Sequence, residues 1–562
     1  MFRLPLVVAL AMTLWNATKP VVVDDTAYLL RAQYIAEHPA DPYGGTLFWN
    51  SAPEPAMDVL APPLLPYWLA LGMRLFGEHL FALKLWLFPF AWLLCASMCA
   101  LLRRFAGGAE RPALILFAAA IVPLFNFMLD LPALALGTAA VAVFLCANDR
   151  KIWPAAIFAG VLMALAMQTK YSMLVVPAVI GWVGLTHRRI LPALVAILVA
   201  VDLCAYWELA MAEQYSQSHF LLHSRGELGG SVDANEVNVW EKAAAFVDKR
   251  AALPLPLLAQ LGGLSFGILV WQIWIVLGRR WLFWPIVGVL FSTLVAVLFL
   301  TYSQTVLYPE AIGAYLILDL PTVLFGTVSL LLFALLGVGC GYLLLRDTPR
   351  RTLIFLAGWL LIEIAACLVL SPFPAARRVL GVEVVMALMA ARVAARFGVI
   401  DATRQTKRWL LLTALIPAVV VASVDNWDAW PEKVLAERAA EVVQPAAGET
   451  VWFRGHWGFQ WYCERSGMRP VVVNQSRLRK GDWLVYPYLP DAGFYRPYHG
   501  GYDFPIANDH VEWIADLIWL DGLSAQTIPN MHGGSVVISG RDHPRLKVGI
   551  FRVTNDWVPS TR

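Results

Sequence analysis

The segment LPLVVALAMTLWNATKPVVVDDTAYLLRA, residues 4–32, is an apolar run that ends at two adjacent carboxylates. Arg3 precedes the run, and no cleavage site of the A-x-A type follows it. We therefore expect an uncleaved first transmembrane helix over 4–23, with Arg3 on the cytoplasmic side.

The two carboxylates, Asp24 and Asp25, stand where this first helix should leave the membrane. Tyr28, Ala32 and Ile35 follow at helical spacing, which predicts that the acids begin a second, short helix. Negative charge is favourable at a helix start, so both carboxylates would be fixed above the bilayer. The alternative is a pair of solvated loop acids with no chemical role.

The composition of the rest of the chain also indicates a membrane protein. Of the 562 residues, 59% are hydrophobic and only 15% are charged, whereas soluble proteins average about 25% charged residues. The net charge of +3 gives no support for nucleic-acid binding. Six of the seven cysteines lie in apolar runs and none forms a CxxC pair, so we predict neither a disulfide nor a cysteine metal site.

At roughly 20 apolar residues per crossing, the chain should form about thirteen spans. Their expected limits are 4–23, 80–102, 111–129, 131–147, 153–169, 171–186, 190–211, 254–278, 281–301, 321–345, 352–371, 379–395 and 408–424. Basic residues fall at alternate turns, namely Arg103-Arg104, Arg150-Lys151, Arg188-Arg189, Arg279-Arg280, Arg346 with Arg350-Arg351, and Arg404 with Lys407-Arg408. By the positive-inside rule these turns are cytoplasmic, so the N-terminus lies inside and the tail outside.

The expected architecture is an all-α polytopic membrane domain, 1–424, with external loops 24–79 and 212–253, followed by a soluble periplasmic α/β domain, 425–562. In the first loop, Pro62 to Phe76 should form an amphipathic helix lying on the outer leaflet. In the tail, Glu449 to Phe453 and Val536 to Ile538 are expected as strands, and Val511 to Leu520 as a helix.

Further charged residues fall at external turns and are candidates for a site. Asp130 stands between leucines at membrane depth, where an acid is costly without a partner; the alternative is a helix-start cap. Lys170, Arg377 and Arg378 run against the positive-inside trend and together would hold an anionic headgroup, although a single lysine can also snorkel to either interface. Other residues expected to line the substrate cavity are Tyr28, Tyr67, His219, His223, Arg225 and Glu310. A zinc site at the His219–His223 pair lacks a clear third ligand.

Several motifs, in order along the chain, resemble one known family. Asp-Asp-Thr-Ala-Tyr-Leu at 24–29 is similar to the acidic motif of the GT-C glycosyltransferases, and within them of the protein O-mannosyltransferase and aminoarabinose-transferase group. The similarity continues in Ala-Pro-Pro-Leu-Leu-Pro-Tyr-Trp at 61–68, Ala-Leu-Ala-Met-Gln-Thr-Lys at 164–170, Pro-Ala-Ala-Arg-Arg-Val-Leu at 374–380 and Gly-His-Trp-Gly-Phe-Gln-Trp-Tyr at 455–462. The chain departs from the pattern at Ala61, where the family often has Lys or His, and at Ala27, where some members have Arg.

The resemblance implies a GT-C fold and a transferase that moves a sugar from a polyprenyl-phosphate carrier to a glycan, lipid or protein hydroxyl on the periplasmic face of the bacterial inner membrane. Asp24 would be the general base of an inverting displacement, supported by Asp25 and Asp130. Lys170, Arg377 and Arg378 would bind the donor phosphate. No cofactor is required, although two adjacent acids could hold a divalent metal. The alternative function is a polytopic transporter or flippase of lipid-linked sugars, which would place its charges near the midplane.

Overall fold

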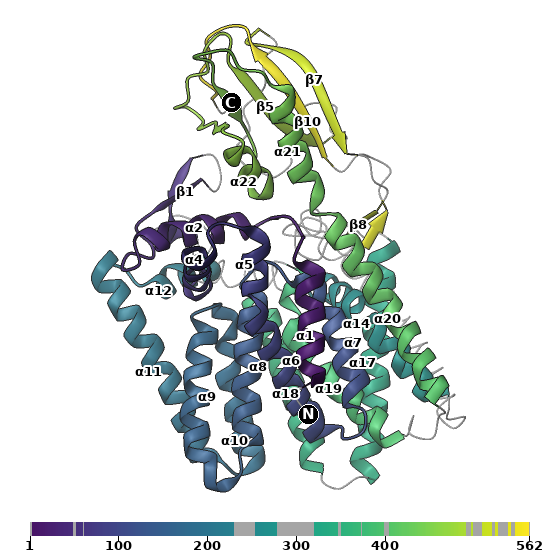
Figure 1. Ribbon diagram of the computed structural model, residues 1–562. Coiled ribbons are helices and arrows are strands. Elements are labelled where there is room, and N and C mark those ends of the chain that lie inside the picture. Colours follow the sequence, from purple (N-terminus) through teal and green to yellow (C-terminus); the bar gives the residue numbers. More distant parts are fainter. Residues whose placement is uncertain are drawn as a thin grey trace.

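The computed structural model describes residues 3–48, 52–59, 61–229, 253–277, 320–346, 350–371, 374–397, 404–489, 496–497, 509–519, 523–525, 538–540 and 546–560. A bundle of long helices forms one end of the molecule, a layer of short helices crosses the top of the bundle, and a β-sheet domain lies beyond that layer (Figure 1). Seven of the described helices are long and apolar enough to cross a membrane.

The bundle follows the expected order of spans. Its helices are α1 (Arg3–Asn16), α5 (Leu80–Trp86) with α6 (Phe88–Phe105), α7 (Glu110–Ile121), α8 (Asp130–Cys146), α9 (Ile152–Met167), α10 (Val175–His187), α11 (Ile190–Tyr215), α14 (Pro254–Leu277), α17 (Leu320–Arg346), α18 (Arg350–Leu370), α19 (Leu380–Phe397) and α20 (Arg404–Trp427). Short 3-10 turns adjoin four of them, namely η1 (Val122–Leu124), η2 (Asp149–Lys151), η3 (Tyr171–Leu174) and η5 (Ala376–Arg378). The predicted span 281–301 lies outside the described residues.

The centre of the bundle is α8, which is buried along almost its whole length. Its residues are apolar on every face, and such a helix is stable only when other helices surround it. It packs between α6 and α9. By contrast, α11 is largely exposed along its apolar length, as at Leu191, Leu198 and Leu209, which is the pattern of a helix facing lipid.

The first helix is shorter than the sequence suggested, since α1 ends at Asn16 instead of residue 23. Pro20 disfavours helical backbone at the preceding residue, Lys19, and so prevents the helix from continuing. The Asn16 amide donates to the carbonyls of Met12 and Val122, at 3.0 and 3.1 Å. The apolar residues after it therefore run as an irregular segment to Asp24.

Above the bundle, α2 (Asp25–Glu37), α3 (Ala56–Val59), α4 (Leu64–Phe76) and α12 (His219–Gly229) form the cross-layer with the hairpin of β1 (Thr46–Phe48) and β2 (Pro53–Pro55) (Figure 1). Helix α2 confirms the prediction that the acid pair begins a helix, and helix α4 confirms the helix predicted over 62–76. The two pack together, so the acid pair stands at one end of a helix supported from below.

The C-terminal sheet domain begins with α21 (Trp430–Val442), followed by β3 (Val451–Phe453), α22 (Trp457–Arg465), β4 (Arg469–Pro470), β5 (Trp483–Leu489), β6 (Arg496–Pro497), β7 (Val511–Trp519), β8 (Leu523–Ala525), β9 (Ile538–Gly540) and β10 (Leu546–Val553). The main sheet has the order β4-β3-β5-β10-β7, with β6 paired to β5. Strand β3 pairs in parallel with β4 and β5, whereas β5, β10 and β7 pair antiparallel.

The strand predicted over 449–453 is confirmed by β3, but the helix predicted over 511–520 is wrong. That segment is β7, which pairs with β10 from Val511 opposite Val553 to Trp519 opposite Leu546. Its apolar residues do not alternate strictly, and this irregularity suggested a helix. Pairing along the whole length of β10 determines the strand instead, because backbone N–H and C=O groups there find ladder partners.

Candidate functional site

Asp24 stands at the N-terminal end of α2 and is 8% exposed. Its Oδ2 accepts a hydrogen bond from Arg377 Nη1 at 2.8 Å, which joins two residues 353 positions apart. Its Oδ1 has no hydrogen-bond partner among the described residues. Asp24 therefore has one oxygen bound to a guanidinium and a second, buried oxygen without a hydrogen-bond partner among the described residues.

Asp25, the next residue, is fully buried and has other partners. Its Oδ2 lies 3.8 Å from Lys84 Nζ and accepts the backbone N–H of Val22 at 3.3 Å. Burial raises the pKa of the Asp25 carboxyl to about 6, and the nearby ammonium groups of Lys84 and Lys19 act in the opposite direction. This position suits a carboxylate that holds the segment in place.

Lys84 was not singled out from the sequence and completes this part of the site. It is 1% exposed, donates to Asn126 Oδ1 at 3.2 Å and lies over the ring of Phe127, 4.2 Å from its centroid. The sequence did contain a signal for Lys84, because a lone lysine near the start of an apolar span needs a partner inside the protein. Its partner could not be read from the sequence.

Asp130, the first residue of α8, forms an ion pair with Lys170, which follows α9. Both side chains are largely buried. Burial lowers the pKa of Lys170 to about 8, while the Asp130 carboxylate acts in the opposite direction. The two residues that the sequence placed at separate external turns thus meet, and Asp130 holds the ammonium in position.

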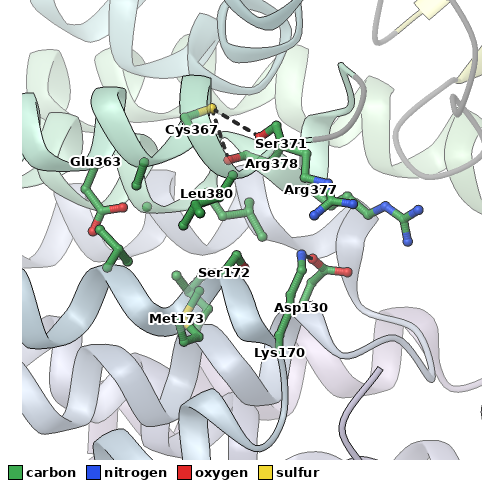
Figure 2. Close-up of a pocket in the computed structure, with 15 residues that line it drawn as sticks. Asp130, Lys170, Ser172, Met173, Glu363, Cys367, Ser371, Arg377, Arg378 and Leu380 are labelled. Carbon is green, nitrogen blue, oxygen red and sulfur yellow. Dashed lines mark hydrogen bonds and ion pairs between the residues drawn. The ribbon is translucent and has the colours of Figure 1, made fainter. Parts of the chain in front are cut away.

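Arg377 and Arg378 occupy η5, the turn before α19. With Lys170 and Asp130 they line one side of a partly open cavity whose other lining residues come from α8, η3, α10, α18 and α19 (Figure 2). Its remaining wall is mainly apolar and includes Leu134, Met173, Val175, Ala366, Leu370 and Leu380. The cavity therefore has a cationic end beside Asp24's partner Arg377 and an apolar side.

A second, more apolar cavity adjoins the first. The two share Leu134, Met173, Val175, Glu363 and Gly381, and the deeper one extends to Val179 and Val384. Its one acid, Glu363, accepts a hydrogen bond from Trp359 Nε1 at 2.9 Å. The two cavities therefore lie next to each other between α8, α10, α18 and α19, and the cations are at the outer end of the first.

Tyr28 lies one turn after Asp24 in α2 and is 6% exposed. Burial, together with the negative charges of Asp24 and Asp130, raises its pKa, and Arg377 opposes this effect. A phenol that stays protonated can donate a hydrogen bond but cannot act as a base. Tyr28 therefore lies close enough to Asp24, Arg377 and Asp130 for their charges to affect its pKa, and its predicted place in the substrate cavity stays a prediction.

The other predicted cavity residues lie elsewhere. Tyr171 Oη is 2.6 Å from His219 Nδ1 and donates to Glu208 at 3.1 Å, and His219 stacks on Tyr43 and contacts His223. Tyr67 Oη donates to the carbonyl of Pro39. Lys170 of the first cluster and Tyr171 of the second are neighbours in the sequence. The described residues contain no group of three or more His, Cys, Asp or Glu side chains arranged for a metal. Glu310 and the side chain of Arg225 lie outside the described part.

The fold and site define a polytopic helical protein with a buried charge cluster at the end of the bundle that carries the sheet domain. Neither models of protein families nor curated proteins give a match. Solved structures that are similar to this chain include the following three.

The first is the archaeal oligosaccharyltransferase AglB from Archaeoglobus fulgidus in complex with an inhibitory peptide and a dolichol-phosphate, with 12% identity, 83% of this chain covered and a TM-score of 0.45. The second is ArnT from Cupriavidus metallidurans bound to undecaprenyl phosphate, with 14% identity, 86% of this chain and 92% of that chain covered and a TM-score of 0.40. The third is the Archaeoglobus fulgidus oligosaccharyltransferase tethered with an acceptor peptide, with 13% identity, 84% of this chain covered and a TM-score of 0.41. This chain spans 64% of the length of either oligosaccharyltransferase chain. The functional proposal rests on the site itself.

Proposed function

We propose that the chain is a membrane glycosyltransferase that moves a sugar from a polyprenyl-phosphate carrier to a hydroxyl acceptor at the periplasmic face of the inner membrane. The observation that carries this proposal is the cavity in Figure 2, which combines three cationic side chains at one end with a mainly apolar wall and adjoins a second apolar cavity. A lipid phosphate needs both features together. A free nucleotide sugar would have no apolar chain to place against this wall.

The cations Lys170, Arg377 and Arg378 would bind the donor phosphate, and the apolar residues of the two cavities would contact the first part of the prenyl chain. Guanidinium groups bind phosphate oxygens through paired hydrogen bonds, which are stronger than neutral ones. During transfer the bond between the anomeric carbon and the phosphate oxygen breaks, and the electron pair goes to the phosphate. Cations fixed beforehand stabilise that developing charge.

Asp24 would be the general base. Its unpartnered Oδ1 accepts the proton of the acceptor hydroxyl as the acceptor oxygen bonds to the anomeric carbon, and a single displacement of this kind inverts that carbon. Arg377 contacts Asp24 and lines the cavity, so it would link the base to the leaving group. Asp130 would act through Lys170 by fixing the ammonium, and Asp25 would anchor the segment. The scheme requires no metal.

Arg378 gives a direct test of the donor site, since it is half-buried, lines the cavity and is not the residue paired with Asp24. Arg378→Ala should raise the donor KM about tenfold to a hundredfold, because one contact to a charged group contributes roughly 1.5–3 kcal/mol. Arg350→Ala is the matched control, as it removes an exposed arginine at the start of α18. Steady-state kinetics with a polyprenyl-phosphate sugar measure both. Equal donor KM values for the two variants would remove Arg378 from the site.

The pH dependence should report on Lys170. Its pKa of about 8 in the free protein means that the ammonium is lost as pH rises through that value. We expect kcat/KM for the donor, which reports the free enzyme, to fall above pH about 8. Lys170→Arg should shift this decline to higher pH, because a guanidinium stays charged. An unchanged alkaline limb in Lys170→Arg would show that another group titrates.

A further inference from the structure

The segment that carries the acid pair is in contact with helix α22 of the C-terminal sheet domain. The backbone N–H of Val21 donates to Tyr462 Oη at 2.9 Å, and Thr26 Oγ1 donates to the carbonyl of Trp457 at 2.6 Å. Asp24 and Asp25 lie between these two attachment points. Residues before and after the two acids are therefore each bound to residues of α22 that lie more than 400 positions away in the sequence.

At Gly458 of α22 the contact leaves no room for a side chain. A Cβ added to Gly458 would collide with the carbonyl oxygen of Val21 and with the Glu432 carboxylate. Glu432, on α21, in turn accepts backbone hydrogen bonds from Gly458 and Phe459, which are N–H groups that the first turn of a helix leaves unpaired. Thus α21 fixes α22, and the bare backbone of α22 lies directly against the acid-bearing segment.

The start of the segment is attached as well. Lys19 forms an ion pair with Asp425 near the end of α20 and donates to the carbonyl of Pro123 at 3.2 Å. The side-chain amide of Asn426 donates to the carbonyl of Trp15 at 3.2 Å. The segment between α1 and α2 is therefore held at its start by the end of α20 and at its far end by α22.

The backbone on both sides of the contact is in an unfavourable conformation. Val23, directly before the acids, has φ of 49°, and Trp457 has φ of 61°. Side chains rarely adopt this left-handed region, and a β-branched valine does so least readily. Such residues persist only where the surrounding contacts enforce them, and they concentrate at functional sites. Here the enforcing contacts are those of Val21, Thr26 and Gly458.

We infer that α22 is a positioning element of the active site, in which Tyr462, the Trp457 carbonyl and Gly458 hold residues 21–26 so that the Asp24 carboxylate meets Arg377, which lines the cavity. This inference rests on the proposed function insofar as Asp24 is the base. It assigns the sheet domain a role in turnover beyond any binding of partners.

Tyr462→Phe and Gly458→Ala test the inference in the full-length protein. The first removes the oxygen that accepts from Val21, and the second forces α22 and the segment apart. We expect kcat to fall roughly tenfold in Tyr462→Phe and further in Gly458→Ala, with the donor KM changed less than twofold, because the cations of the cavity are not displaced. Tyr488→Phe is the matched control, since it removes a hydroxyl that bonds Asp516 at 2.9 Å within the sheet. Its kcat should equal that of the wild type.

A conservative pair separates positioning from simple loss of stability. Thr26→Val keeps the shape of the side chain but loses the hydrogen bond to the Trp457 carbonyl, so its kcat should fall. Thr26→Ser keeps the hydroxyl, so its kcat should stay near the wild-type value. Wild-type kcat in Tyr462→Phe, Gly458→Ala and Thr26→Val would overturn the inference while leaving the proposed function intact.

Amide hydrogen exchange of residues 20–27 gives a readout that does not depend on any donor. Exchange should be faster in Tyr462→Phe and Gly458→Ala than in the wild type and in Tyr488→Phe. If the wild-type protein fails to turn over any polyprenyl-phosphate sugar, the proposed function fails, and this exchange measurement still decides whether α22 holds the segment. Equal exchange in all four proteins would show that it does not.

Discussion

Asp24→Asn should lower turnover of a polyprenyl-phosphate sugar by about 10²–10⁴, the usual loss when a general base is removed. Asparagine keeps the shape of the side chain, and its amide oxygen can still accept the bond from Arg377. It cannot take a proton from the acceptor. We therefore expect the variant to insert, fold and bind the carrier lipid, with the loss confined to kcat.

Glu37→Gln is the control for this change, because it neutralises an exposed carboxylate at the other end of the same helix. Exposed substitutions of this kind usually change stability by no more than about 0.5 kcal/mol, and the turnover of Glu37→Gln should match the wild type. Turnover and thermal unfolding of the purified proteins measure both effects. Near wild-type turnover in Asp24→Asn would exclude Asp24 as the base and make Asp130 the next candidate.

Lys84→Met should produce the largest loss of stability. It leaves the fully buried Asp25 carboxylate without its nearest ammonium, and breaking a buried pair in this way costs about 3–5 kcal/mol. Adding Asp25→Asn to this variant should recover much of the loss, because no buried charge is then left unpaired. Thermal unfolding of both variants at pH 7.5 is the measurement.

The loss in Lys84→Met should depend on pH with a defined sign. In the wild type the Asp25 pKa is raised from 3.8 to about 6, so the folded state favours the protonated acid, and this stabilisation decreases as pH rises from about 4 to about 6. Without Lys84 the folded pKa rises further, and the decrease extends to higher pH. Lys84→Met should therefore be closer to wild-type stability at pH 5 than at pH 7.5. An equal deficit at both values would contradict the pairing with Asp25.

The sequence predicted the helical bundle well, because apolar runs of membrane length leave few alternatives to a helix. It also predicted the helix that Asp24 and Asp25 begin, since the spacing of Tyr28, Ala32 and Ile35 is local information. It could not separate the two acids. Consecutive helical residues point in directions about 100° apart, and only the fold shows that Asp24 meets Arg377 while Asp25 meets Lys84.

Errors arose where distant contacts override local pattern. The segment Val511–Trp519 has the composition of either element, and its pairing with β10 makes it a strand. Likewise nothing near Val21 in the sequence indicates that Tyr462 would accept its N–H, or that Gly458 must lack a side chain there. Arg377 and Arg378 could be recognised as unusual because they lie at an external turn, against the positive-inside rule. That rule depends only on the position of a residue in the sequence, so it needs no knowledge of the residue's partners.

The central claim is that the cavity between α8, α10, α18 and α19 binds a polyprenyl phosphate. An experimental structure of the full chain with that lipid bound tests this most directly. We predict the phosphate within hydrogen-bonding distance of Lys170 and Arg378, with the prenyl chain along Leu134, Met173 and Val175 and the Asp24 carboxylate facing the same space. A phosphate bound at any other place on the protein, with this cavity empty or closed, would contradict the account.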